Sequence, residues 1–128
     1  MSAVTGRALV LDEGLSLWGG MDPATGLLID ARHPQRGVSL TGRIVVMPSG
    51  RGSSSSASVL AEAVRARTAP AAILLGEPDL ILSIGAAVAE ELYGVRVPVL
   101  TIGGVRLARI REGDPIEITD DGTLTSAP

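Results

Sequence analysis

The chain alternates short apolar runs with polar, glycine-rich connections. Apolar runs of strand length occur at 7–11, 43–47, 71–75 and 97–102. The β-branched run at 43–47 is typical of a strand buried on both faces. Apolar and polar residues alternate at 116–119, which predicts a half-exposed strand before a turn at 120–122. We expect the tail after Thr123 to fray.

Two further segments show the spacing of amphipathic helices. The first covers 56–67, where serines precede the apolar positions and can cap the helix. The second follows Pro78 and ends at Gly94. Its apolar stripe predicts core packing, with Glu90 and Glu91 on the solvated face; the stripe comprises Leu80, Ile81, Ile84, Ala87, Val88 and Leu92.

This order of elements predicts an α/β fold in which helices pack on a central sheet. We expect one domain over 1–128, with its core at about 5–120. The connection at 14–42 is long and rich in Gly, Pro and Asp, and its apolar run at 27–29 could form a short strand. Connections of this length are usually functional.

Composition narrows the function classes. Hydrophobic residues make up 45% of the 128 residues and the mean hydropathy is +0.35, an apolar surplus that indicates an interface. The formal charge of −3 argues against nucleic acid and anionic lipid as partners. Only Trp18 and Tyr93 are aromatic, so a stacking platform for bases is absent from the sequence.

The chain has no cysteine and a single histidine, His33. It therefore offers neither a disulfide nor thiolate ligands for an iron–sulfur cluster, and we expect no metal site in this chain. The N-terminal residues show neither a signal peptide nor a membrane span, so we expect a cytoplasmic protein.

The segment 48–56, Pro-Ser-Gly-Arg-Gly-Ser-Ser-Ser-Ser, joins a predicted strand to a predicted helix. Backbone N–H groups at the helix start, together with Arg51, predict a site for carboxylate or phosphate oxygens. A tight turn with capping serines explains the same residues equally well. The spacing matches neither a Walker loop nor a Gly-x-Ser-x-Gly nucleophile elbow, and the chain has no lysine.

Two other segments carry candidate chemistry. His33 with Asp30 and a loop serine could form a hydrolase triad, but a histidine before proline is more typical of a turn whose imidazole caps backbone. The segment 16–26 could line a pocket or contact a partner, and the interpretation we favour on the pattern alone is a surface loop with Trp18 in the core.

Taken together and in order, several motifs resemble the small subunit, or swivel domain, of the aconitase X family. The resemblance covers roughly residues 5–105 and is carried by the segments 15–26, 29–34, 48–55, 68–73, 77–79 and 89–94. It implies a swivelling β/β/α domain that closes over a larger catalytic subunit. That partner would hold an iron or iron–sulfur centre, and the pair would form a heterodimer that removes water from a hydroxy acid.

The resemblance also implies roles for the loop residues. The serine after Gly-Arg-Gly or Gly-Lys-Gly is the proton acceptor of the family, which is Ser53 in this sequence. Its neighbours Arg51, Gly52, Ser54 and Ser55 are then expected to bind substrate or to stabilise the serine alkoxide. The partner's iron would take the leaving hydroxyl.

The family divides between dehydratases of cis-3-hydroxy-L-proline and of mevalonate 5-phosphate. Gly-Arg-Gly-Ser-Ser-Ser is closer to the first type, which favours hydroxyproline as substrate. The sequence departs from the family pattern at Gly14, Leu17, Met21 and 56–58, and the last departure bears on loop flexibility and substrate choice. Two alternatives stay open: a free-standing module that binds small anions, and a homo-oligomer that buries the apolar surplus.

Overall fold

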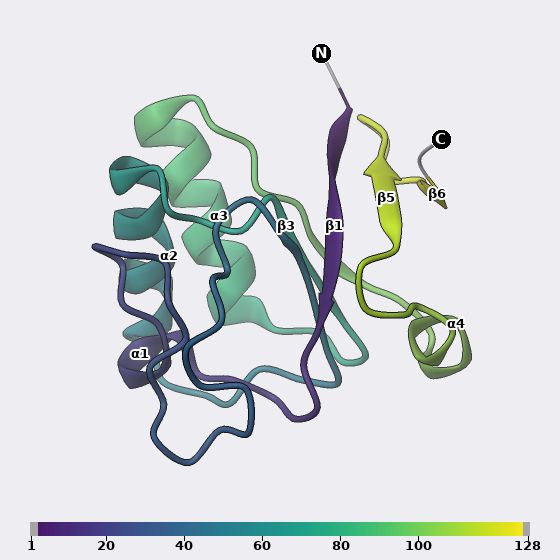
Figure 1. The fold of residues 1–128 in the computed structure, drawn as a ribbon. Coiled ribbons are helices and arrows are strands. Elements are labelled where there is room, and N and C mark those ends of the chain that lie inside the picture. The colour runs from purple at the N-terminus through teal and green to yellow at the C-terminus, as the bar shows by residue number, and fades with distance from the viewer. Residues whose placement is uncertain (1–2, 127–128) are drawn as a thin grey trace.

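A single mixed sheet of six strands forms the centre of the computed structural model, which describes residues 3–126 (Figure 1). The strand order is β4-β3-β2-β1-β5-β6; β1 to β4 are parallel, β5 is antiparallel to β1, and β6 is antiparallel to β5. The strands are β1 (Val4–Val10), β2 (Ile44–Met47), β3 (Ala72–Leu75), β4 (Val99–Thr101), β5 (Pro115–Ile118) and β6 (Leu124–Ser126).

Helices lie on both sides of this sheet. They are α1 (Leu17–Gly20), α2 (Ser56–Ala66), α3 (Leu80–Tyr93) and α4 (Gly104–Ala108). Figure 1 shows α1, α2 and α3 on one side of β1 and β3, and α4 on the other side together with the β5–β6 hairpin. Within the described part of the chain, no helix is long and apolar enough to span a bilayer.

The strand register divides the core between the two sides of the sheet. Leu9, Val45 and Ile73 are paired across β1, β2 and β3, and all three belong to the cluster under α2 and α3. The preceding row, Ala8, Ile44 and Ala72, belongs to the cluster under α4 and the hairpin. Successive side chains of a strand point to opposite faces, so each strand contributes to both cores. The continuous apolar runs in the sequence result from this double burial.

Most of the predicted elements are confirmed, as is the α/β fold class. The last four residues of the run at 43–47 form β2 and are all buried, and β5 alternates as predicted. β1 begins at Val4, three residues before the predicted start, because it continues as the partner of β5. Only Val99–Thr101 of the run at 97–102 form a strand, since Pro98 has no N–H to donate to the ladder.

Two predictions about local structure are wrong, and one short helix was missed. Residues 124–126 do not fray but form β6, paired with β5; residues 127 and 128 lie outside the described part. The run at 27–29 is not a named strand, because only isolated bridges form there, from Leu28 to Met21 and from Leu27 to Ser39. The short helix α4 lacks a strong pattern and was not predicted.

The prediction for α3 is correct in its bounds and wrong in its buried face. Asp79 caps the start by accepting a hydrogen bond from Leu82 N–H at 3.0 Å, and Gly94 ends the helix with φ +68°. The face toward the core carries Leu82, Gly85, Ala86 and Ala89, whereas most of the predicted stripe is exposed. A helix that is apolar almost all round does not reveal its buried face by periodicity alone.

Candidate functional site

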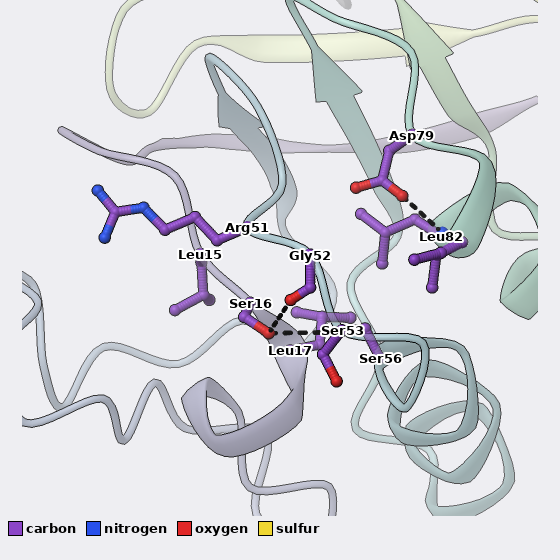
Figure 2. Close-up of a pocket in the computed structure, with 10 residues that line it drawn as sticks. Leu15, Ser16, Leu17, Arg51, Gly52, Ser53, Ser56, Asp79 and Leu82 are labelled. Atoms are coloured by element: carbon purple, nitrogen blue, oxygen red, sulfur yellow. Dashed lines mark hydrogen bonds between the residues drawn. The ribbon is translucent and has the colours of Figure 1, made fainter.

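A small pocket lies at the edge of the sheet where the parallel strands β1, β2 and β3 end. We call it the site pocket, and Figure 2 shows the side chains that line it. The lining residues form three walls, one after each of these strands. The first wall, after β1, is Leu15, Ser16 and Leu17; the second, after β2, is Arg51, Gly52, Ser53 and Ser56; the third, after β3, is Asp79, Ile81 and Leu82. The carboxyl ends of parallel strands are the usual place for ligand sites in open α/β sheets.

Ser53 has a strained backbone at the centre of the second wall. Its φ is +151°, a conformation that residues with a side chain rarely adopt and that costs about 1–3 kcal/mol. The strain is held by the turn that starts α2, where Ser56 N–H donates to the Ser53 carbonyl at 3.0 Å. Ser55 N–H donates to Ser53 Oγ at 3.3 Å. Strained residues of this kind cluster at functional sites, which supports Ser53 as a candidate.

Two hydroxyls join the first wall to the second. Ser16 Oγ lies 3.3 Å from Ser56 Oγ and 3.4 Å from the Gly52 carbonyl oxygen. Ser56 is buried at 5% exposure, and its Oγ accepts a hydrogen bond from Trp18 N–H at 3.2 Å. The Ser16 hydroxyl has one proton and also lies 3.2 Å from the Trp18 carbonyl, so it donates to one of these partners at a time.

The third wall contacts the loop at Gly50. One carboxylate oxygen of Asp79 caps α3, and the other faces Gly50 so closely that a β-carbon there would overlap it. Glycine is therefore required at this approach of α3 to the loop. Leu15 and Gly50 form a parallel bridge, and Arg51 N–H donates to the Leu15 carbonyl at 3.3 Å. The three walls thus meet near Gly50, the first two through backbone pairing and the third through the Asp79 carboxylate.

The Arg51 side chain points out of the site pocket. Figure 2 shows its guanidinium directed away from Gly52 and Ser53, and it pairs with Glu13 at 3.6 Å. The Arg51 side chain is 57% exposed, and exposed ion pairs contribute about 0–1 kcal/mol. The pair therefore costs little to break when an anion competes for the guanidinium.

The predicted site residues are only partly brought together. Arg51, Gly52 and Ser53 line the site pocket, whereas Ser54 and Ser55 are exposed beside it at the start of α2. The sequence interpretation did not include Ser16, Ser56 and Asp79 among the site residues. A signal for Ser16 and Asp79 was present, since both lie in segments that carried the resemblance.

Two interpretations outside the loop have clear outcomes. His33 is buried; its Nδ1 accepts a hydrogen bond from Gln35 N–H, and its Nε2 donates to the Glu13 carbonyl, each at 3.1 Å. The prediction of a turn histidine that caps backbone is confirmed, and both ring nitrogens are engaged away from any serine. Placing Trp18 in the core was wrong, because its side chain is 59% exposed.

The site pocket is too small to enclose a substrate. Its volume is about 10 Å³, roughly the room that one water molecule needs. Within residues 3–126, no cluster of three or more His, Cys, Asp or Glu side chains has the geometry of a metal site. The fold and the pocket together define an α/β domain with a small pocket at the carboxyl ends of its parallel strands.

The family is established by sequence. The family model described as the aconitase X swivel domain matches residues 1–126, and the chain belongs to this family. The fold is similar to that in the crystal structure of Thermococcus kodakaraensis aconitase X in its holo-form. The TM-score is 0.83 at 30% identity, over 98% of this chain and 89% of that one. These matches confirm the predicted swivel-domain fold.

Two curated relatives illustrate how the family is built. The chain is 48% identical over 101 residues to the cis-3-hydroxy-L-proline dehydratase of Pseudomonas aeruginosa, covering 79% of this chain. It spans only 17% of the length of that relative. It is 34% identical over 119 residues to the phosphomevalonate dehydratase small subunit of Thermococcus kodakarensis, covering 91% of this chain and 89% of that subunit. The same domain therefore occurs within a long chain and as a separate small subunit.

Proposed function

We propose that this chain is the small subunit of a heteromeric hydro-lyase of the aconitase X type, and that it supplies the serine base for dehydrating cis-3-hydroxy-L-proline. The observation that carries the proposal is the pocket with three walls, which is lined by Ser53 with its strained backbone and has room for about one water. A pocket too small to enclose a substrate needs a second body to complete the site. The small-subunit names of relatives support a larger catalytic subunit as that body.

The iron centre belongs on the partner. The described residues do not fit an iron site, because they hold no cluster of suitable ligands and the sequence has no cysteine. The role of this chain is therefore the handling of a proton.

Dehydration of a 3-hydroxy acid breaks the C–H bond next to the carboxylate. The C–H electron pair forms the double bond as the hydroxyl on the neighbouring carbon departs. In our proposal Ser53 Oγ, as alkoxide, accepts that proton and becomes a neutral hydroxyl. The base must lie within hydrogen-bonding reach, about 3 Å, of the proton it removes, and Ser53 lines the pocket that the substrate would approach.

Two features of the loop support an alkoxide at Ser53. Ser55 N–H already donates to Ser53 Oγ, and a hydrogen bond to the charged form lowers the pKa of a hydroxyl. The 11-residue helix α2 starts three residues later, so its positive end faces the same oxygen. Arg51 is proposed to leave Glu13 on closure and to bind the substrate carboxylate, with Gly52, Ser54 and Ser55 contributing hydrogen-bond donors.

The loop sequence and the relatives favour cis-3-hydroxy-L-proline over mevalonate 5-phosphate. Identity is 48% to the hydroxyproline dehydratase of Pseudomonas aeruginosa, against 30–41% to phosphomevalonate dehydratase small subunits. The two substrates differ in charge, because the phosphate adds about −1.5 to −2 at neutral pH. The loop carries a single cation, Arg51, which suits one carboxylate.

The test is a dehydration assay of this chain co-expressed with its large subunit, on both substrates in parallel. We expect turnover of cis-3-hydroxy-L-proline to require both chains, and Ser53→Ala to lower kcat by at least about 100-fold. Ser39→Ala, an exposed serine in the long connection, is the matched control and should keep full activity. Full turnover in the Ser53→Ala complex would refute the assigned base.

A further inference from the structure

The outer face of α3 is an apolar ridge. Leu80, Ile84, Val88 and Leu92 recur at every fourth residue and are 74%, 49%, 42% and 63% exposed. Residues four apart on a helix are neighbours on its surface, so the four side chains form one row. We call this row the α3 ridge. From Leu80 to Leu92 it extends for about 18 Å.

A groove runs beside the ridge, between α3 and α2. Its floor is made of small residues, because Gly85 lies directly against the backbone of Ala57. The groove has a volume of about 270 Å³, with Val88 of the ridge and Tyr93 among its lining residues. A ridge next to a groove with a small-residue floor can receive the side chains of another helix or strand.

The α3 ridge is continuous with the site pocket. Ile81 and Leu82 line the pocket, and Ile81 is a surface neighbour of Ile84 in the ridge because the two residues lie three apart on the helix. A body that closes the pocket over Ser53 therefore meets the start of the ridge as well. The apolar surface then extends the same contact along α3.

The charged side chains near the α3 ridge limit which molecules can bind to it. The only charged side chains on α3 are Glu90 and Glu91, and Glu62 at the groove is paired with Arg65. An acidic rim repels anionic lipid headgroups. In a symmetric dimer through this ridge it would also bring like charges together. The surface suits an apolar patch that is rimmed by Arg or Lys.

We propose that the α3 ridge is the docking surface for the large catalytic subunit, which contacts it with an apolar segment flanked by basic residues. The proposal rests on the proposed function, since it takes the large subunit as the body that closes the site pocket. The docking proposal goes beyond the proposed function by naming the surface that holds the large subunit. The ridge provides affinity, and Ser53 provides chemistry, so the two can be separated by mutation.

The test measures both affinity and turnover of the complex. Leu80→Glu changes an exposed residue in the first turn of α3, where a carboxylate is compatible with the helix dipole. We expect it to weaken binding of the large subunit by about 30-fold or more, as for a hot-spot residue. Turnover at saturating partner should stay unchanged. Ile84→Glu, in the middle of the ridge, is the second variant and should give the same result.

Val105→Glu is the matched control. Val105 is 73% exposed in the first turn of α4, as Leu80 is 74% exposed in the first turn of α3, but α4 lies across the sheet. Affinity should not change in this variant. Circular dichroism and thermal melting of each variant establish that it is folded before its affinity is measured.

Several outcomes would overturn the docking proposal. They are unchanged affinity in both ridge variants, an equal loss in Val105→Glu, and a homodimer of the isolated chain that Leu80→Glu dissociates. The proposed function fails separately, if the wild-type complex forms but dehydrates neither substrate, or if Ser53→Ala keeps full turnover. In those cases weakened binding in the ridge variants would still support the docking surface.

Discussion

Ser16 Oγ lies 3.3 Å from Ser56 Oγ, and this contact joins the segment after β1 to the start of α2. Ser56 Oγ also accepts a hydrogen bond from Trp18 N–H, and Ser16 lies within hydrogen-bonding distance of the Gly52 carbonyl. Two hydroxyls therefore fix the walls of the pocket on either side of Ser53. The strained conformation at Ser53 depends on such external support.

Removal of the buried hydroxyl should loosen the site. Ser56→Ala leaves Trp18 N–H without its partner and removes one contact of Ser16 Oγ, and we expect a loss of about 1 kcal/mol in the free energy of unfolding. Urea denaturation measures this loss. Ser58→Ala, at an exposed position two residues later in α2, should be neutral or slightly stabilising. Equal stability of Ser56→Ala and wild type would contradict the supporting role of this hydroxyl.

Ser53→Gly should separate stability from activity. Glycine adopts φ near +151° without steric cost, so we expect the unfolding free energy to rise by about 1 kcal/mol while turnover of the complex is lost. Ser53→Ala loses turnover but keeps the strain, which makes it the control for stability. The comparison uses denaturation midpoints of the two variants. A glycine variant that is no more stable than the alanine variant would argue against strain at this residue.

The contact between Gly50 and Asp79 predicts a coupled pair of mutations. Gly50→Ala places a methyl group against the Asp79 carboxylate and should destabilise the protein by about 1–3 kcal/mol. Asp79→Ala removes the cap of α3 and should cost about 1 kcal/mol. In the double variant the overlap is gone, so the combined loss should be smaller than the sum. A double-mutant cycle by urea denaturation measures the coupling, and strict additivity would contradict the contact.

Asp121 predicts a pH effect in the β5–β6 turn. Hydrogen bonds from the side chain of Thr119 and from Thr123 lower the pKa of this carboxyl to about 2. Because the folded pKa lies below the unfolded value of about 3.9, the stabilisation is complete above that value. It is lost as the pH falls through about 2. Carbon NMR should show the Asp121 carboxyl titrating near 2. Thr119→Val should raise this pKa, and an unchanged midpoint would contradict the assigned cause.

The central sheet could be predicted because its strands are short apolar runs that are buried on both faces. The register of β1, β2 and β3 places alternate residues in two cores, and this leaves a continuous signal in the sequence. β6 and α4 lack that signal. β6 is stabilised by pairing with β5, a tertiary contact that no local pattern reports.

The loop with Ser53 could also be predicted, from its glycines and serines and from the motif it carries. The walls around it could not, because Ser16 and Asp79 come from segments 37 residues before and 26 residues after it along the chain. Only the parallel arrangement of the strands brings their carboxyl ends to one edge. The buried face of α3 could not be predicted either, because it depends on a tertiary contact. Where α3 packs closely on α2, the buried positions hold small residues such as Gly85 rather than the largest apolar ones.

The pairing of Val4 with Ile118 has a consequence for how this domain can be joined to other polypeptides. It places the start of β1 at the edge of the sheet opposite the site pocket, and β6 pairs with the same part of β5 (Figure 1). A polypeptide joined before β1 would therefore meet the domain at the end of the sheet that lies away from the site pocket. Such a junction is compatible with an open pocket, and relatives carry this domain in one long chain or as a separate subunit.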